Sequence, residues 1–172
     1  MKVAVILGTS RGDGNTRKLV DEFSVFSDAK VFDLADYDIS FYDYEHHNQG
    51  DDFLPLMREL ALFEHIVYAT PLYWYSMSAQ LKVFFDRISD LLTIDKDLGR
   101  QLKGKSASML ATGHNKDFPE CFVQPIALTT EYLKMEFKGI GYASVQSDND
   151  LMALSKVAMQ SYETITRGEF AH

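Results

Sequence analysis

Residues 69–87, ATPLYWYSMSAQLKVFFDR, connect the end of an apolar run to the start of an amphipathic helix pattern. The run begins upstream, at residues 65–70 (HIVYAT), and has the continuous hydrophobicity of a strand that is buried on both faces. From Leu81 onward, apolar residues recur at helical spacing. This segment therefore predicts a strand, a turn and a helix, the repeating unit of a parallel sheet.

Similar units extend over the whole chain. Further apolar runs are found at residues 2–7 (KVAVIL), 106–112 (SASMLAT) and 141–145 (GYASV), with a shorter candidate at 30–34 (KVFDL). Helical patterns occupy the intervals, at residues 16–23, 53–60, 81–92, 119–134 and 151–165. This alternation predicts an α/β fold, a five-stranded parallel sheet with helices on both faces. No internal repeat or linker divides the sequence, so we expect residues 1–172 to form a single domain.

The composition restricts the class of partner. A formal net charge of −8, without any run of basic residues, argues against nucleic acid. No apolar stretch approaches the roughly 20 residues that span a bilayer, and the N-terminus lacks the features of a signal peptide. The single cysteine, Cys121, excludes an intrachain disulfide and suits a reducing compartment. We therefore expect a cytoplasmic protein with small-molecule partners.

The loop after the first predicted strand is rich in glycine. Residues 8–16, GTSRGDGNT, lead into a helix, whose N-terminus offers N–H groups and a positive dipole end. Because ligands of open α/β sheets bind at such strand ends, we interpret this loop as a phosphate site. It matches neither G-x-x-x-x-G-K-[ST] nor G-x-G-x-x-G. An alternative is a plain connection in which Asn15 or Thr16 caps the helix.

Residues 71–77, PLYWYSM, place three aromatic residues in a turn, where small polar residues are usual. The rings could simply pack over the end of the sheet. Beside a phosphate loop, however, an aromatic turn supplies the apolar slot and backbone hydrogen bonds that a flat heteroaromatic ring requires. We expect Ser76 or Ser78 to cap the following helix.

A third loop, after the run 106–112, begins with Gly113 and His114. Gly113 would let the backbone approach a ligand closely. His114 is either an ordinary surface histidine or a residue that contacts the ligand.

Together, the three loops resemble those of the flavodoxin-like NAD(P)H-dependent FMN reductase and quinone reductase family. Residues 8–16 are similar to its phosphate loop, G-S-x-R-x-x-x-N-T, and residues 71–87 to its more specific signature, P-x-Y-x-x-S-x-x-x-x-L-K-x-x-x-D-R. The resemblance extends from residue 3 to about residue 165 and implies a flavodoxin-like doubly wound sandwich.

The resemblance implies an enzyme that binds FMN. The first loop would hold the phosphate, residues 71–76 would lie against the ring, and Thr112 with Gly113 would close the other side. The implied cofactor-binding residues are Thr9, Ser10, Arg11, Asn15, Thr16, Pro71, Leu72, Tyr73, Trp74, Tyr75, Ser76, Thr112, Gly113 and His114.

The implied reaction is a ping-pong transfer, in which NAD(P)H reduces the flavin and a small acceptor then takes the electrons. Quinones, nitro- or azo-aromatics and free flavin are the expected acceptors. No catalytic residue is named, because the cofactor carries the chemistry. The resemblance also implies a homodimer with the flavin near the interface.

Residues 40–52 depart from relatives in which closely spaced cysteines hold an iron–sulfur cluster, since this segment has no cysteine. Acidic residues together with His46 and His47 occupy it instead. Adjacent histidines point in divergent directions in an extended chain, so we expect a solvated acidic loop rather than a metal site.

Two other functions use the same scaffold. A flavodoxin-type electron carrier would dock redox proteins, and the acidic surface suits basic partners. Such carriers usually have a phosphate loop closer to T-x-T-G-N-T, so Arg11 favours the reductases. A binding domain without flavin is the third possibility, since fold does not fix function.

Overall fold

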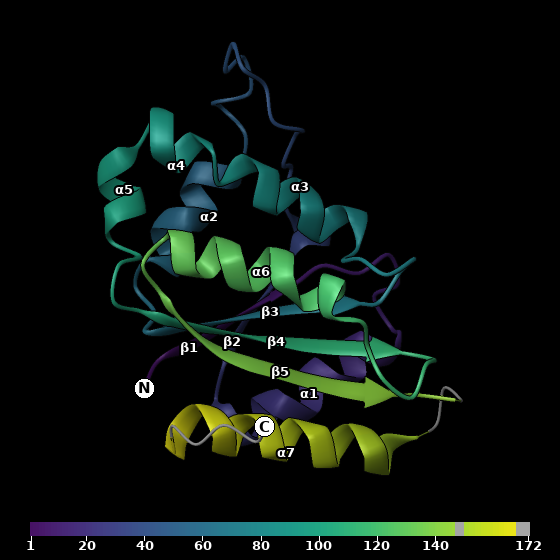
Figure 1. Cartoon of the computed structure of the whole chain (residues 1–172). Coiled ribbons are helices and arrows are strands. Elements are labelled where there is room, and N and C mark those ends of the chain that lie inside the picture. Colours follow the sequence, from purple (N-terminus) through teal and green to yellow (C-terminus); the bar gives the residue numbers. More distant parts are fainter. Residues whose placement is uncertain (147–149, 168–172) are drawn as a thin grey trace.

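A computed structural model describes residues 1–146 and 150–167. Five parallel strands form one sheet in the order β2-β1-β3-β4-β5 (Figure 1). The strands are β1 Val3–Leu7, β2 Lys30–Asp33, β3 His65–Pro71, β4 Ser106–Gly113 and β5 Glu136–Ser144. Successive strands are added on opposite sides of β1, so the switch point lies between the carboxyl ends of β1 and β3. The predicted doubly wound α/β fold is confirmed.

Helices cover both faces of the sheet (Figure 1). Helices α1 (Asn15–Ser27) and α7 (Leu151–Arg167) pack side by side on one face. The other face carries α2 (Phe53–Leu60), α3 (Ala79–Arg87), α4 (Asp90–Thr93), α5 (Lys96–Arg100) and α6 (Glu120–Tyr132), and a 3-10 turn, η1 (Leu34–Asp36), follows β2. Within residues 1–146 and 150–167, no helix is both long enough and apolar enough to cross a bilayer.

Two elements differ from the sequence predictions. The single helix expected over residues 81–92 ends at Arg87 and is followed by the short helices α4 and α5. The strand expected at 141–145 begins five residues earlier, at Glu136. Its first residues were left out of the prediction because β5 is a half-exposed edge strand, with Gly139 at φ +91° and an irregular register against β4, and so lacks a continuous apolar run.

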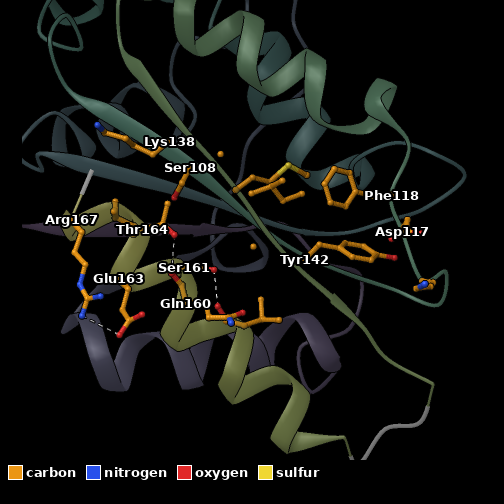
Figure 2. Close-up of a pocket in the computed structure, with 17 residues that line it drawn as sticks. Ser108, Asp117, Phe118, Lys138, Tyr142, Gln160, Ser161, Glu163, Thr164 and Arg167 are labelled. Carbon is orange, nitrogen blue, oxygen red and sulfur yellow. Dashed lines mark hydrogen bonds and ion pairs between the residues drawn. The ribbon is translucent and has the colours of Figure 1, made fainter. Parts of the chain in front are cut away.

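Helix α7 approaches β5 closely at Gly141. A Cβ atom there would lie 1.9 Å from Ser161 Oγ, so a side chain at this position would push the helix away. Next to this contact, β5 and α7 leave a groove of about 650 Å³ (Figure 2). Tyr142 and Phe118 form one of its ends, and Lys138, Thr164 and Arg167 lie at the other.

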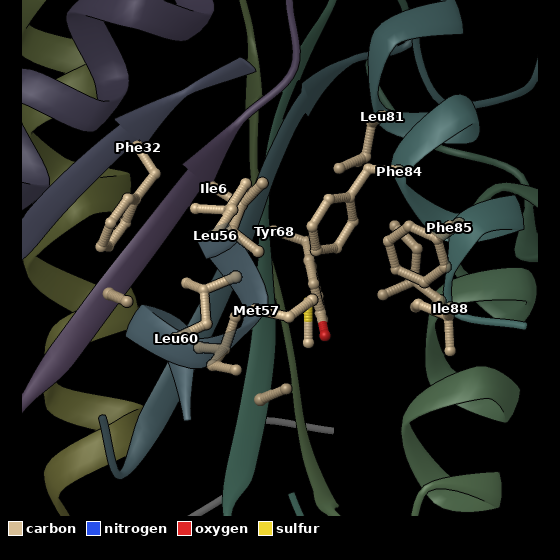
Figure 3. Packing of buried hydrophobic residues seen from close by; sticks show 14 of the residues in the cluster. Ile6, Phe32, Leu56, Met57, Leu60, Tyr68, Leu81, Phe84, Phe85 and Ile88 are labelled. Carbon is tan, nitrogen blue, oxygen red and sulfur yellow. The ribbon is translucent and has the colours of Figure 1, made fainter. Parts of the chain in front are cut away.

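Two hydrophobic cores, one on each face, hold the helices to the sheet. In β1, Ala4 and Ile6 face α2 and α3, whereas Val3, Val5 and Leu7 face α1 and α7. Figure 3 shows the first core, where Ile6 and Tyr68 of the sheet meet Leu56, Met57 and Leu60 of α2 and Phe84 and Phe85 of α3. Each such side chain contributes roughly 1.5–3 kcal/mol by its burial.

The connection between η1 and α2 is an organised loop whose ends are tied together. The Asp38 N–H donates to the Asp52 carboxylate at 2.8 Å, and the Asp52 N–H donates to the Asp38 carbonyl at 2.9 Å. Beneath it lies Arg87, whose side chain is fully buried and forms ion pairs with Asp51 and Asp90. The expectation of a solvated acidic loop is therefore wrong for Asp51, whose side chain is only 7% exposed.

The two histidines of this loop contact different carboxylates. His47 Nδ1 lies 2.7 Å from Asp43 Oδ2, and His46 Nδ1 lies 3.5 Å from the buried Asp90 carboxylate. Among the described residues, no three His, Cys, Asp or Glu side chains are arranged as metal ligands.

Candidate FMN site

A hollow of about 210 Å³ opens at the carboxyl edge of the sheet, at the switch point between β1 and β3. It is formed by the loops that follow β1, β3 and β4. Its lining residues are Thr9, Arg11, Gly14, Asn15, Thr16, Pro71, Leu72, Tyr73, Thr112, Gly113, His114 and Val145. The three loops singled out in the sequence thus meet at one place, because parallel strands end at the same edge.

The loop after β1 leads directly into the N-terminus of α1. Gly14 is the N-cap and provides no side-chain cap, and Asn15 and Thr16 are the first helical residues, so the alternative in which either one caps the helix is wrong. A Cβ at Gly14 would lie 3.3 Å from the Arg11 carbonyl oxygen, which accepts the Gly14 N–H at 3.2 Å. Arg11 and the first residues of a 13-residue helix line the hollow, and positive charge beside a helix N-terminus suits an anion.

Arg11 itself is a surface side chain. Its Nε donates to Asp13 Oδ1 at 2.9 Å, and its N–H donates to Thr9 Oγ1 at 3.3 Å. The guanidinium beside Asp13 lowers the pKa of that carboxyl, which stays ionised at neutral pH.

Ser78 connects the first and second loops. Its Oγ accepts the Leu81 N–H at 3.2 Å, which confirms the expected N-cap of α3, and donates to the Gly8 carbonyl at 2.7 Å. Close by, Thr16 Oγ1 and Thr112 Oγ1 lie 2.7 Å apart and so join α1 to the end of β4. These two contacts fix the walls of the hollow relative to one another.

The aromatic turn is a tight two-residue loop. Tyr73 and Ser76 exchange backbone hydrogen bonds of 3.0 Å, and between them Trp74 and Tyr75 have φ values of +47° and +67°. Bulky residues rarely adopt this left-handed conformation, which costs about 1–2 kcal/mol per residue. Trp74 is 94% exposed, so the alternative in which the rings pack over the sheet end is wrong for the tip of the turn.

The third loop is held close to the end of β5. His114 Nδ1 lies 2.9 Å from the Val145 carbonyl oxygen, so this nitrogen carries the hydrogen and Nε2 is the acceptor of the neutral ring. The Val145 N–H in turn donates to the Gly113 carbonyl at 2.8 Å.

The structure brings most of the expected residues to the hollow, namely Thr9, Arg11, Asn15, Thr16, Pro71, Leu72, Tyr73, Thr112, Gly113 and His114. Ser10, Trp74, Tyr75 and Ser76 lie outside it, and Ser10 contacts the Gln80 amide at 3.2 Å. Gly14 and Val145 were not expected. Gly14 could have been found as the glycine directly before the helix, whereas Val145 is a plain strand-end residue without a signal.

The residues present suit FMN. One end of the hollow offers helix N–H groups, hydroxyls and a guanidinium for a phosphate, and the other offers apolar walls from Pro71, Leu72 and Val145. The larger groove between β5 and α7 has fewer groups for binding a phosphate, because its serine and threonine hydroxyls are hydrogen-bonded within the protein. Ser161 and Thr164 donate to carbonyls of their own helix, and Ser108 Oγ contacts the buried His65 ring.

The fold and this site define a flavodoxin-like protein. The family model "NADPH-dependent FMN reductase" matches residues 1–118, and the chain belongs to that family. YwqN of Bacillus subtilis (strain 168), named as an NAD(P)H-dependent FMN-containing oxidoreductase, is 32% identical over 151 residues, which cover 81% of this chain and 82% of YwqN. The protein is therefore an oxidoreductase with FMN as cofactor and NAD(P)H as co-substrate.

Solved structures support the fold. The Trp repressor binding protein from Bacillus subtilis aligns with a TM-score of 0.75 and 24% identity, over 98% of this chain and all of that one. A protein from P. pentosaceus described as NADPH-quinone reductase aligns with a TM-score of 0.67 and 17% identity, over 94% and 98% of the two chains.

Proposed function

We propose that the chain binds FMN in the hollow at the carboxyl edge and reduces a small acceptor with electrons from NAD(P)H. The observation that carries the proposal is the N-terminus of α1, which has no side-chain cap and lies beside Arg11 and an apolar slot at the switch point. A flavin mononucleotide has the same two parts, a dianionic phosphate and a flat ring system.

Arg11 would hold the phosphate by charge, together with Asn15, Thr16 and the first N–H groups of α1. Thr9 and Ser10 would support this loop, the first through its bond to the Arg11 N–H and the second through Gln80. A guanidinium at a helix N-terminus stabilises a phosphate by charge-assisted hydrogen bonds, which are about twice as strong as neutral ones.

The ring would lie between the aromatic turn and the third loop. Pro71, Leu72 and Tyr73 would form one wall, and Thr112, Gly113 and His114 the other, with Trp74, Tyr75 and Ser76 at the rim. These groups would orient the ring and exclude water from one side of it. The left-handed turn at Trp74 and Tyr75 supports a functional role, since such conformations concentrate at ligand sites.

The chemistry that FMN supplies when bound is a two-electron transfer from NAD(P)H to a second small molecule, in ping-pong order. A quinone, a nitro- or azo-aromatic or free flavin is the proposed acceptor. The quinone is supported by the name of the neighbour from P. pentosaceus. We assign no proton-transfer residue.

We further propose that the 172 residues form one domain, that the protein works in the cytoplasm and that it forms a homodimer. The nearly full exposure of Trp74 supports the dimer, because a partner would remove this ring from water. Light scattering after gel filtration should give twice the monomer mass of 19.6 kDa, and a monomer mass would contradict the dimer.

Steady-state kinetics test the reaction. Initial rates are measured with FMN-loaded protein, with NADPH varied at several fixed concentrations of a benzoquinone. Parallel double-reciprocal lines are expected for the ping-pong order, and intersecting lines would contradict it. Failure to oxidise NADPH with any acceptor class would instead favour the electron carrier, which the net charge of −8 suits.

A further inference from the structure

Tyr142 lies on β5 directly beside the loop that follows β4. Its hydroxyl donates to the Asn115 carbonyl at 2.9 Å, and its ring packs edge-on against Phe118, with the ring centroids 5.2 Å apart. Figure 2 shows the two rings together at one end of the groove, with Asp117 beyond them. A single side chain from the edge strand thus contacts both ends of residues 115–118.

The start of this loop has other anchors, but its middle has few. Gly113 and His114 are held by three hydrogen bonds with the strand end. The Val145 N–H donates to the Gly113 carbonyl, His114 Nδ1 donates to the Val145 carbonyl, and the Gln146 amide donates to the His114 carbonyl at 2.6 Å. For residues 115–118, the Tyr142 hydroxyl makes the one hydrogen bond found in the described part of the chain. Asn115, Lys116 and Asp117 are otherwise exposed to solvent.

The tyrosine also lies against Gly113, a lining residue of the hollow. A Cβ at Gly113 would lie 2.4 Å from Tyr142 Oη and 3.2 Å from Cζ, with Leu72 Cβ at 3.3 Å. Position 113 therefore has room for no side chain because the tyrosine hydroxyl occupies that space. Tyr142 thus packs against a residue that lines the hollow without lining the hollow itself.

We propose that Tyr142 is a positioning residue for the FMN site, which holds the 113–118 loop and with it the wall formed by Gly113 and His114. This inference rests on the proposed function of the hollow. Tyr142 does not line the hollow, so it would affect FMN affinity through the position of the 113–118 loop. The hydrogen bond fixes Asn115, the ring fixes Phe118, and the hydroxyl sets the position of Gly113.

The protonation state of the tyrosine suits this role. Burial, and then the negative charge of Asp117, raise the pKa of Tyr142 above its usual value of 10. The hydroxyl therefore remains a donor throughout the neutral range, and the loop is expected to keep its anchor at every pH at which the enzyme is assayed.

The first test uses the protein without FMN. Tryptic cleavage after Lys116 under native conditions is measured in the wild type, in Tyr142→Phe and in Tyr162→Phe, a matched control on α7 whose ring packs against Phe23. Tyr142→Phe should speed this cleavage by about threefold to tenfold, the loss expected for one neutral hydrogen bond, and Tyr162→Phe should leave it unchanged. Unchanged cleavage in Tyr142→Phe would overturn the proposal.

The second test measures FMN affinity by fluorescence quenching in the same proteins and in Gly113→Ala and Gly113→Ala/Tyr142→Phe. Tyr142→Phe should raise Kd by about threefold to tenfold, and Gly113→Ala by more, because its methyl group meets the hydroxyl. The double variant should bind more tightly than Gly113→Ala, since removing the hydroxyl makes room for the methyl group.

The outcomes distinguish a failure of the proposed FMN site from a failure of the role of Tyr142. Wild-type protein that binds no FMN would overturn the proposed function. Wild-type protein that binds FMN, with Tyr142→Phe within twofold of its affinity or a double variant no better than Gly113→Ala, would overturn the role of Tyr142 alone. If Gly113→Ala does not fold, the FMN affinity of Tyr142→Phe, compared with that of Tyr162→Phe, tests the role of Tyr142.

Discussion

Two arginines of this protein stand in opposite environments. Arg11, at the hollow, keeps 56% of its side chain exposed and pairs with Asp13, which is more exposed still. Arg87, at the end of α3, has no exposed side-chain area and pairs with Asp51 and Asp90, which are also buried. A charge near solvent can exchange its partner for a ligand at little cost, whereas a buried charge is committed to its partners.

The contrast between Arg11 and Arg87 distinguishes motif residues that border the hollow from motif residues that stabilise the fold. The signature over residues 71–87 ends in Arg87, yet this residue lies outside the hollow. Its Nη2 donates to Asp51 at 3.1 Å, its Nε donates to Asp90 at 2.8 Å, and its guanidinium lies 4.9 Å from the Phe53 ring centroid. Arg87 thus ties the loop before α2 to α3, and we expect its loss to affect folding rather than binding.

Removal of Arg87 should have the largest effect. Arg87→Ala leaves Asp51 and Asp90 buried without their counter-charge, so the free energy of unfolding should fall by about 3–5 kcal/mol. Urea denaturation measures this loss. Arg100→Ala removes an exposed arginine that pairs with Asp97 and should change stability by no more than about 0.5 kcal/mol. Equal losses of unfolding free energy in Arg87→Ala and Arg100→Ala would contradict a structural role for the buried arginine.

A buried histidine gives the second prediction. His65 is fully buried, and its two ring nitrogens contact Ser106 Oγ at 2.7 Å and Ser108 Oγ at 2.8 Å. Burial, and then Lys138, lower the pKa of His65 to about 4, against about 6.5 in the unfolded chain. Between these values the unfolded state binds more protons, so stability is fully present above pH 6.5 and falls as the pH drops towards 4.

Between pH 7 and pH 5 this histidine should account for about 2 kcal/mol of lost stability. Urea denaturation at the two pH values should show a smaller loss in His65→Gln than in the wild type. The exposed His47 offers a control, because His47→Gln changes an imidazole outside the core. The same pH-dependent loss in wild type and His65→Gln would show that His65 is not kept neutral by the fold.

Arg11 should show the reverse behaviour, with the smallest effect on stability and a clear effect on binding. Arg11→Ala removes a charge-assisted contact to the phosphate worth about 1.5–3 kcal/mol, so Kd for FMN should rise by about tenfold to a hundredfold. Arg17, in the first turn of α1, pairs with Asp21 outside the hollow, and Arg17→Ala should leave Kd within about twofold. A smaller rise in Kd for Arg11→Ala than for Arg17→Ala would contradict the assignment of the phosphate to the loop that contains Arg11.

Much of the fold could be predicted because most strands are buried on both faces. The continuous apolar runs KVAVIL and HIVYAT predict strands buried on both faces, and the structure places them at β1 and β3. The edge strand β5 was predicted too short, because its first residues are half exposed and include Gly139 in a left-handed conformation. Partial burial removes the hydrophobic signal on which such predictions rest.

The site was predictable as far as it depends on strand ends. Loops after β1, β3 and β4 must meet at one edge, so most expected residues line one hollow. The roles of Arg87 and Tyr142 could not be predicted, since each depends on a contact with a distant segment, Asp51 in one case and Asn115 in the other. A charge on a helix gives no sign in the sequence that its partner is buried.

The most direct test of the central claim is an absorption spectrum of the purified protein, loaded with FMN and freed of excess by gel filtration, before and after anaerobic addition of NADPH. We expect oxidised-flavin bands that remain with the protein and bleach when NADPH is added. Bands that stay unchanged would contradict the reductase function and point to a carrier. Protein that leaves the column without any flavin bands would contradict the assignment of the hollow to FMN.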